Sequence, residues 1–189
     1  MSVRIAQVTT PPSRAGRHLD PARTSALKAG KFFPATERGL RDAVAPDDVI
    51  NQSPPADGAI ASTGDPSAAQ LDRPGSDWAK TDVRAGQRLD VVWNDVSGAV
   101  RRWNYFLTRP GWDPSLPLGR DQFEPDPVHR VENTRQPYWL ATRELVPEGA
   151  VTHAVELPVR SAGHHVLLAV CETADTGNAA YEVIDLRYV

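Results

Sequence analysis

Apolar and polar residues alternate along much of the second half of the chain. In the stretch 101–109, Trp103, Tyr105 and Leu107 share one side. Successive side chains of a strand point to opposite faces of a sheet, so this alternation predicts a β-strand. Further strand-like stretches run over 88–93, 138–145, 151–157, 165–170 and 180–188. Counting one near the N-terminus, about seven short strands separated by turns predict an all-β fold of two packed sheets.

The first third of the chain has a different pattern. A short strand at 4–9 is ended by two consecutive prolines, which have no backbone N–H to donate. From about 14 to 57 the alternation gives way to good helix formers, at 21–29 and 36–44. The pattern therefore predicts a long, partly helical insertion loop after the first strand. Loops of this length in a compact domain usually carry function or are disordered.

Composition agrees with this architecture. A length of 189 residues fits one domain, over 1–189, and 17 prolines and 13 glycines favour turns and loops. The net charge is -3 and the basic residues are scattered, so no electrostatic footprint for nucleic acid is expected. The longest apolar run, 166–171, is far too short to cross a bilayer, so we expect no membrane insertion.

The N-terminal sequence has no apolar stretch of signal-peptide length. The single cysteine, Cys171, has no partner within the chain for a disulfide. We therefore expect the chain to be cytoplasmic at synthesis, with release as part of a particle as one route out of the cell. Because Cys171 follows an apolar run, it is expected to be a small core residue rather than a nucleophile.

Several motifs occur in the order in which they are found in one family. They are Pro11-Pro12-Ser13-Arg14, Pro55-Ala56-Asp57-Gly58-Ala59-Ile60-Ala61-Ser62, the segment from Trp103 to Asp113, Gly163 to Val170, and Ala174 to Asp185. With these the chain resembles the bacterial chitin-binding lytic polysaccharide monooxygenases, auxiliary activity family ten. The resemblance spans nearly the whole chain. It implies an immunoglobulin-like or fibronectin-III-like sandwich in which the insertion forms part of a flat binding face.

The resemblance also implies where a copper site would lie. Enzymes of that family hold one copper in a histidine brace, formed by the amino group and ring of an N-terminal histidine and by a second histidine ring, with an aromatic residue near the axial position. The matching positions here are Ile5, Gly98 and Ala180, and none has a coordinating side chain. No histidine between His18 and His129 could serve as the second copper ligand. The alignment therefore implies a member without copper, without another cofactor and without oxidase activity.

Other residues with metal-binding or catalytic chemistry have simpler interpretations. His164 and His165 are adjacent in a strand and point to opposite faces, so we expect one in the core and one at the surface rather than a shared metal ion. Asp175 and Asn178 flank a Thr-Gly turn, and we expect them to hydrogen-bond the local backbone. A metal at the histidine pair and a catalytic role for Asp175 are the less favoured alternatives.

Aromatic residues that are not expected in the core are the candidates for a binding surface. We select Phe32 and Phe33, because the insertion lies on the binding face of the resembling family. Trp78, Tyr138 and Trp139 are less constrained, and exposed aromatic rings can stack on sugars or anchor a protein partner. The competing interpretation is that these three cover the ends of the sandwich.

Three functions follow from these observations. The first is a non-catalytic module that binds a polysaccharide, either chitin or another cell-wall glycan, or has a structural role. The second is an assembly or attachment protein of a phage-tail-like particle, in which the partner is a protein assembly. The third is an active copper monooxygenase, which the residues at the brace positions oppose.

Overall fold

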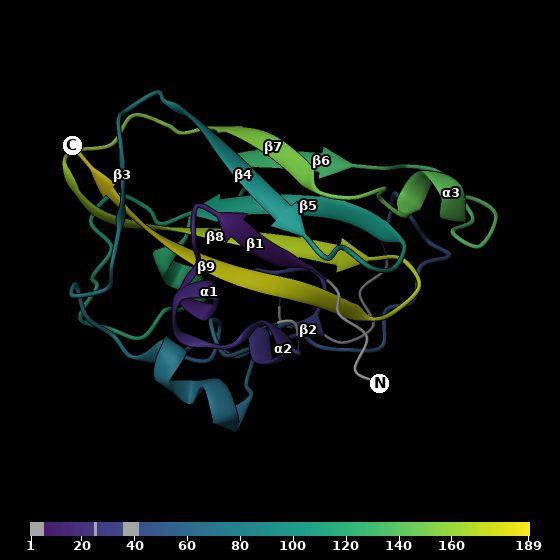
Figure 1. Cartoon of the computed structure of the whole chain (residues 1–189), viewed down its shortest axis with the longest axis horizontal. Helices are drawn as coiled ribbons and strands as arrows, with labels where there is room; N and C mark the ends of the chain where they lie inside the picture. Colours follow the sequence, from purple (N-terminus) through teal and green to yellow (C-terminus); the bar gives the residue numbers. More distant parts are fainter. Residues whose placement is uncertain (1–5, 25, 36–41) are drawn as a thin grey trace.

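The computed structural model describes residues 6–24, 26–35 and 42–189, and it contains two sheets packed face to face (Figure 1). The smaller sheet has the order β1 (Gln7–Thr10), β4 (Arg88–Asn94) and β7 (Val151–Glu156), all antiparallel. Along β4 the burial alternates, because one face lies against the core and the other against solvent. This confirms the sandwich predicted from the alternation.

The central strands of the larger sheet are buried on both faces. Its order is β2 (Ala29–Gly30), β9 (Asn178–Tyr188), β8 (Gly163–Thr173), β5 (Val100–Leu107) and β6 (His129–Glu132), and β3 (Thr81–Val83) pairs parallel with β9. Tyr105 belongs to the core between the two sheets, whereas its neighbour Phe106 belongs to a second core on the other face. Every residue of β5 is therefore buried.

The second core lies beneath a layer of short helices and loops. In Figure 1, α1 (Arg14–His18) and α2 (Pro21–Thr24) lie below the large sheet, and a 3₁₀ helix η1 (Pro66–Asp72) lies further along this layer. Two more short helices, η2 (Arg120–Gln122) and α3 (Thr142–Leu145), belong to later loops. No helix among the described residues is long and apolar enough to cross a membrane.

The insertion is fastened to β9 by a buried ion pair. Ser13 caps α1 by accepting a hydrogen bond from the Gly16 N–H at 3.0 Å, which orients Arg14 towards the sheet. The Arg14 Nε and Nη2 atoms then donate to the two Asp185 carboxylate oxygens at 2.7 and 2.8 Å. Because both side chains are almost fully buried, this contact fixes where the insertion begins.

The end of the insertion packs closely on the same sheet. Gly30 pairs with Asn178 in β9, and a Cβ atom at Gly30 would lie 2.2 Å from the Gln52 carbonyl oxygen. The Tyr181 hydroxyl donates to the Gly30 carbonyl at 2.5 Å. Only glycine allows this approach of two backbones, so β2 ties the outgoing chain to the edge of the sheet.

Some predicted elements differ from the structure. The predicted strand at 138–145 is wrong, since this segment forms turns and α3, with Ala141 and Leu145 facing the apolar cluster that also contains Ala99 and Ala174. A spacing of four residues on one buried face is helical. The predicted helix at 21–29 ends at Thr24, and residues 36–41 of the predicted helix at 36–44 lie outside the described residues.

Candidate functional site

The turn between β4 and β5 contains Gly98, the position to which the resemblance assigns the second brace histidine. Gly98 has φ +99°, a left-handed backbone conformation that side chains rarely adopt. A Cβ atom built there would lie 3.6 Å from each carboxylate oxygen of Asp175, in the hairpin between β8 and β9. The position therefore offers no ligand, and its backbone disfavours every residue that could supply one.

The other two matching positions give no donor either. Ala180 is 2 % exposed, lies opposite Cys171 in the pairing of β9 with β8, and packs its methyl group into the core between the sheets. Ile5 lies outside the described residues. Its side chain is a hydrocarbon and cannot coordinate copper.

The groups around Gly98 do not fit copper. They form a small cavity of about 60 Å³ lined by Lys28, Ser97, Gly98, Thr173, Asp175, Thr176 and Asn178. These side chains offer hydroxyls, an amide, one carboxylate and an ammonium group, whereas copper prefers imidazole and amine nitrogens. Among the described residues no group of three or more His, Cys, Asp or Glu side chains is placed to hold a metal ion.

The hairpin beside Gly98 is held by threonines. The Thr173 and Thr176 hydroxyls lie 2.5 Å apart, and Thr173 Oγ1 also donates to the Asn178 carbonyl at 3.1 Å. The Asn178 N–H donates to Thr176 Oγ1 at 3.2 Å. Within the described part of the chain, neither the Asp175 nor the Asn178 side chain hydrogen-bonds the local backbone, so that prediction is wrong. The threonine hydroxyls close the turn instead, and Asp175 is exposed.

A buried cluster of charges joins the insertion to this end of the large sheet. Arg102 of β5 forms ion pairs with Asp42, with Glu132 at 2.9 Å and with Glu172 at 2.8 Å. Burial raises the pKa of the Glu172 carboxyl, and the Arg102 guanidinium opposes this rise. This cluster could not be predicted from the sequence, because its members are far apart in the chain and charged residues are normally exposed.

Lys31 lies in the same region. Its Nζ atom donates to the Thr173 carbonyl at 2.5 Å, and the lysine is 1 % exposed. Burial lowers the pKa of this ammonium group to about 8, with Asp48 and Glu172 acting in the opposite direction. The contact holds the insertion against the end of β8, next to the hairpin.

Phe32 and Phe33 have separate environments. Phe33 is 4 % exposed and packs its ring edge-on against Phe106, Phe123 and Tyr181, so its prediction as a surface residue is wrong. The ring lies in the second core because the insertion folds back onto the sheet. Phe32 is half-buried, with its N–H donating to Glu172 at 2.9 Å and the Arg102 guanidinium 5.9 Å from its ring centre.

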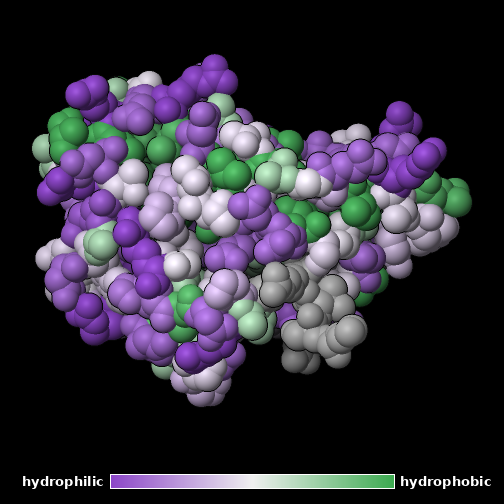
Figure 2. Space-filling model, in the orientation of Figure 1, coloured by the Kyte–Doolittle hydropathy of each residue, from purple (hydrophilic) through white to green (hydrophobic). Residues whose placement is uncertain are grey.

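Among the described residues, Trp139 is the exposed aromatic side chain at this end of the molecule. It is 58 % exposed and Leu140 beside it is 78 % exposed, on the projecting segment before α3. Figure 2 shows hydrophobic atoms on the projection at the right, where α3 lies in Figure 1. The base of the projection packs on Ala99 and Ala174, which neighbour Gly98 and Asp175. The projection therefore borders the turn that contains Gly98.

The histidine pair lies at the other end of β8. The His164 Nε2 atom lies 2.8 Å from Asp185, and the His165 Nδ1 atom lies 3.0 Å from the Thr108 hydroxyl. The two rings thus have different partners on opposite faces, as predicted. The expectation that one of them reaches the surface is wrong, because the His164 side chain and His165 are each only 7 % exposed.

Comparison with known families and structures gives consistent matches. Residues 6–186 match the model of a family described as lytic polysaccharide mono-oxygenase, cellulose-degrading. A chitin binding domain from Burkholderia pseudomallei has a similar structure, with a TM-score of 0.93 and 48 % identity, covering 98 % of this chain and 100 % of that one. An AA10 lytic polysaccharide monooxygenase from Streptomyces lividans has a TM-score of 0.73 and 27 % identity, covering 97 % and 99 %.

One curated relative found by sequence similarity is much longer than this chain. The GlcNAc-binding protein A of Shewanella oneidensis is 35 % identical over 139 residues, which is 72 % of this chain and 27 % of that protein. The chain thus spans about a quarter of the length of the curated relatives it matches.

Proposed function

The chain belongs to the lytic polysaccharide mono-oxygenase family, and from this premise we propose that it is a non-catalytic member that binds a polysaccharide, with chitin as the first candidate. The similarity to a chitin binding domain at 48 % identity, over almost the whole of both chains, supports the choice of chitin.

The proposal that the chain is not an oxidase rests on Gly98. A histidine brace needs a second imidazole here, and glycine supplies none. The left-handed backbone and the nearby Asp175 carboxylate show that the turn is built around glycine. The hydroxyl, carboxylate and ammonium groups around it are poor substitutes for imidazole nitrogens, so we infer that no redox copper is held at this end.

The proposal that the chain binds a polysaccharide rests on the projecting segment that carries Trp139 and Leu140. An exposed indole can stack on the apolar face of a sugar ring. Trp139 and Leu140 form an exposed apolar pair, and the packing of their segment on Ala99 and Ala174 holds it beside the end of the sandwich. A rigid aromatic beside a polar end surface of hydroxyls and carboxylates is the arrangement expected for a glycan-binding face.

Sedimentation with insoluble polysaccharide tests the proposal. The full chain is incubated with chitin, with cellulose and with peptidoglycan, and the free protein is measured. We expect retention on chitin and a loss of about tenfold in affinity for Trp139→Ala, equivalent to ~1.4 kcal/mol. Leu116→Ala is the matched control, since Leu116 is 53 % exposed elsewhere on the surface.

The outcomes separate the alternatives. If no polysaccharide retains the wild-type protein, glycan binding is wrong, and elution in a large complex would then favour the assembly function. For oxidation, chitin is incubated with the protein, copper and ascorbate, and the soluble products are analysed by mass spectrometry. We expect no oxidised oligosaccharides above a protein-free control, and their formation would overturn the non-catalytic assignment.

A further inference from the structure

The exposed Trp139 indole needs neighbours to hold it in place. Trp139 is 58 % exposed, so burial alone does not fix its ring. A side chain that becomes ordered only on binding costs affinity, whereas one that is already ordered does not. The contacts around Trp139 therefore bear on how well it binds a polysaccharide, and the inference drawn from them rests on the function proposed above.

Tyr138 supports the indole directly. Its ring meets the Trp139 ring edge-on, with 5.1 Å between ring centres and 82° between the ring planes. This is one of the two arrangements that aromatic pairs prefer. Tyr138 is half-buried and packs against the apolar cluster that contains Ala99, Ala141 and Ala174. The tyrosine therefore links the exposed indole to the end of the sandwich.

The backbone that carries both rings forms a closed turn. The Leu140 N–H donates to the Pro137 carbonyl at 3.1 Å, and the Ala141 N–H donates to the Tyr138 carbonyl, also at 3.1 Å. Ala141 is 6 % exposed and belongs to the apolar cluster. The segment is thus fixed to the sandwich on the C-terminal side of Trp139.

Gln136 fixes the same segment on the N-terminal side. Its Oε1 atom accepts from the Asp47 N–H at 3.2 Å, and its Nε2 atom donates to the Asp48 carboxylate at 3.4 Å and to the Arg135 carbonyl at 3.1 Å. A carboxamide suits this place because it accepts through its oxygen and donates through its nitrogen. The side chain therefore ties the start of the projecting segment to the end of the insertion.

We propose that Tyr138 and Gln136 are positioning residues for Trp139. Tyr138 sets the orientation of the indole, and Gln136 holds the segment that carries both rings against the insertion. Without them the indole is still present but mobile, and its ordering then opposes binding. The loss corresponds to about threefold to tenfold in affinity for one side chain.

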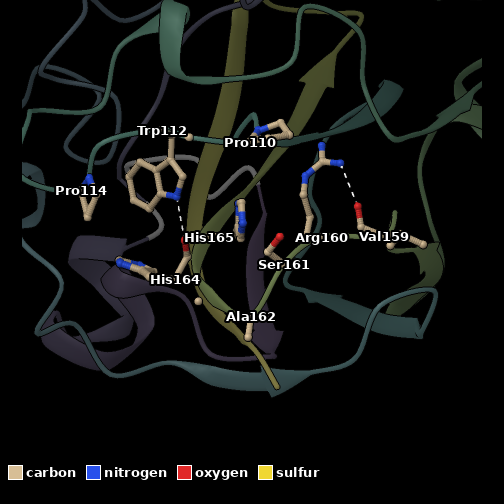
Figure 3. Close-up of a pocket in the computed structure, with 11 residues that line it drawn as sticks. Pro110, Trp112, Pro114, Val159, Arg160, Ser161, Ala162, His164 and His165 are labelled. Atoms are coloured by element: carbon tan, nitrogen blue, oxygen red, sulfur yellow. Dashed lines mark hydrogen bonds between the residues drawn. The ribbon is translucent and has the colours of Figure 1, made fainter.

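The first test measures the mobility of the indole without any polysaccharide. Relaxation of the ¹⁵N-labelled indole N–H groups is recorded for the full chain, and Trp139→Phe identifies the Trp139 signal. Trp112 is the internal reference, because its Nε1 atom donates to the His164 carbonyl at 2.7 Å at the other end of β8 (Figure 3). We expect Tyr138→Ala and Gln136→Ala to lower the order parameter of Trp139 and to leave that of Trp112 unchanged.

The second test is sedimentation of the same variants with chitin. Tyr138→Ala should bind about threefold to tenfold more weakly, whereas Tyr138→Phe keeps the ring and should bind as the wild type does. Ser161→Ala is the control, since Ser161 is exposed at the other end of the molecule (Figure 3). Urea unfolding confirms that each variant is folded. Gln136 lies outside the apolar cluster, so Gln136→Ala tests the proposal even if Tyr138→Ala does not fold.

Two results would overturn the proposal. One is an unchanged order parameter of Trp139 in the folded Tyr138→Ala and Gln136→Ala variants. The other is an equal loss of chitin binding in Tyr138→Phe and Tyr138→Ala, which would make the tyrosine hydroxyl a direct contact of the polysaccharide. If chitin does not retain the wild type, the proposed function is wrong, and the order parameters still decide whether Tyr138 and Gln136 position Trp139.

Discussion

Replacing Arg101 with methionine tests how the insertion and the aromatic projection are held at the proposed binding end. Arg101 is fully buried at the start of β5, and its Nε and Nη2 atoms donate to the Asp48 carboxylate at 2.7 and 2.8 Å. Its Nη1 atom donates to the Asn133 and Arg135 carbonyls at 2.5 and 2.9 Å. One side chain therefore joins the insertion, the sheet and the segment that leads to Trp139.

The size of the effect follows from burial. The Asp48 side chain is 1 % exposed, so Arg101→Met leaves a carboxylate without its cation. Removing one partner of a buried pair costs about 3–5 kcal/mol. At about 2–4 °C per kcal/mol for a domain of this size, the unfolding midpoint should fall by roughly 6–20 °C.

The assay is thermal and urea unfolding of Arg101→Met, Asp48→Asn and the double variant. Asp48→Asn removes the buried carboxylate that Arg101→Met leaves unpaired. The loss of unfolding free energy in the double variant should therefore be smaller than the sum of the two single losses, by about 2–3 kcal/mol. Arg187→Met is the control, since its pair with Asp82 is exposed and should matter much less. A small loss in Arg101→Met, or strictly additive losses, would refute the argument.

Three further predictions concern the core. Gly30→Ala should destabilise the fold by several kcal/mol, since its Cβ would meet the Gln52 carbonyl at 2.2 Å, and urea unfolding would measure this. Burial lowers the pKa of His153 from 6.5 to about 4, so the unfolded state takes up the proton first as the pH falls. About 3 kcal/mol of stability should therefore be lost between these two pH values, which urea unfolding at each pH would measure. The loss should be smaller in His153→Asn, and an unchanged dependence on pH in that variant would contradict the argument. Burial raises the pKa of the Cys171 thiol, so a thiol reagent should label it only as fast as the protein unfolds, and fast labelling of the native protein would contradict its position in the core.

The alternation of residues predicted the sandwich because local pattern decides which faces are buried. Trp103, Tyr105 and Leu107 all lie in the core between the sheets, as their spacing indicates. The pattern could not predict that the other face of β5 is also buried. That depends on where the insertion folds back, which is fixed by contacts between distant residues such as Arg14 and Asp185.

The candidate site was predicted in part. The match of Gly98 to a ligand position follows from the motifs around it, but its left-handed backbone and its distance from Asp175 do not. Phe33 was misplaced because aromatic residues in a loop have no period that shows which side is buried. The ion pairs of Arg102 bring together three segments of the chain, and sequence spacing carries no information on such contacts.

The most direct test of the central claim is a titration of the purified full chain with Cu(II), followed by electron paramagnetic resonance. The account predicts no stoichiometric, tightly held copper, because the Gly98 and Ala180 side chains supply no nitrogen donor and the neighbouring groups are hydroxyls, an amide, a carboxylate and an ammonium. One tightly bound equivalent with the spectrum of three nitrogen ligands would contradict it.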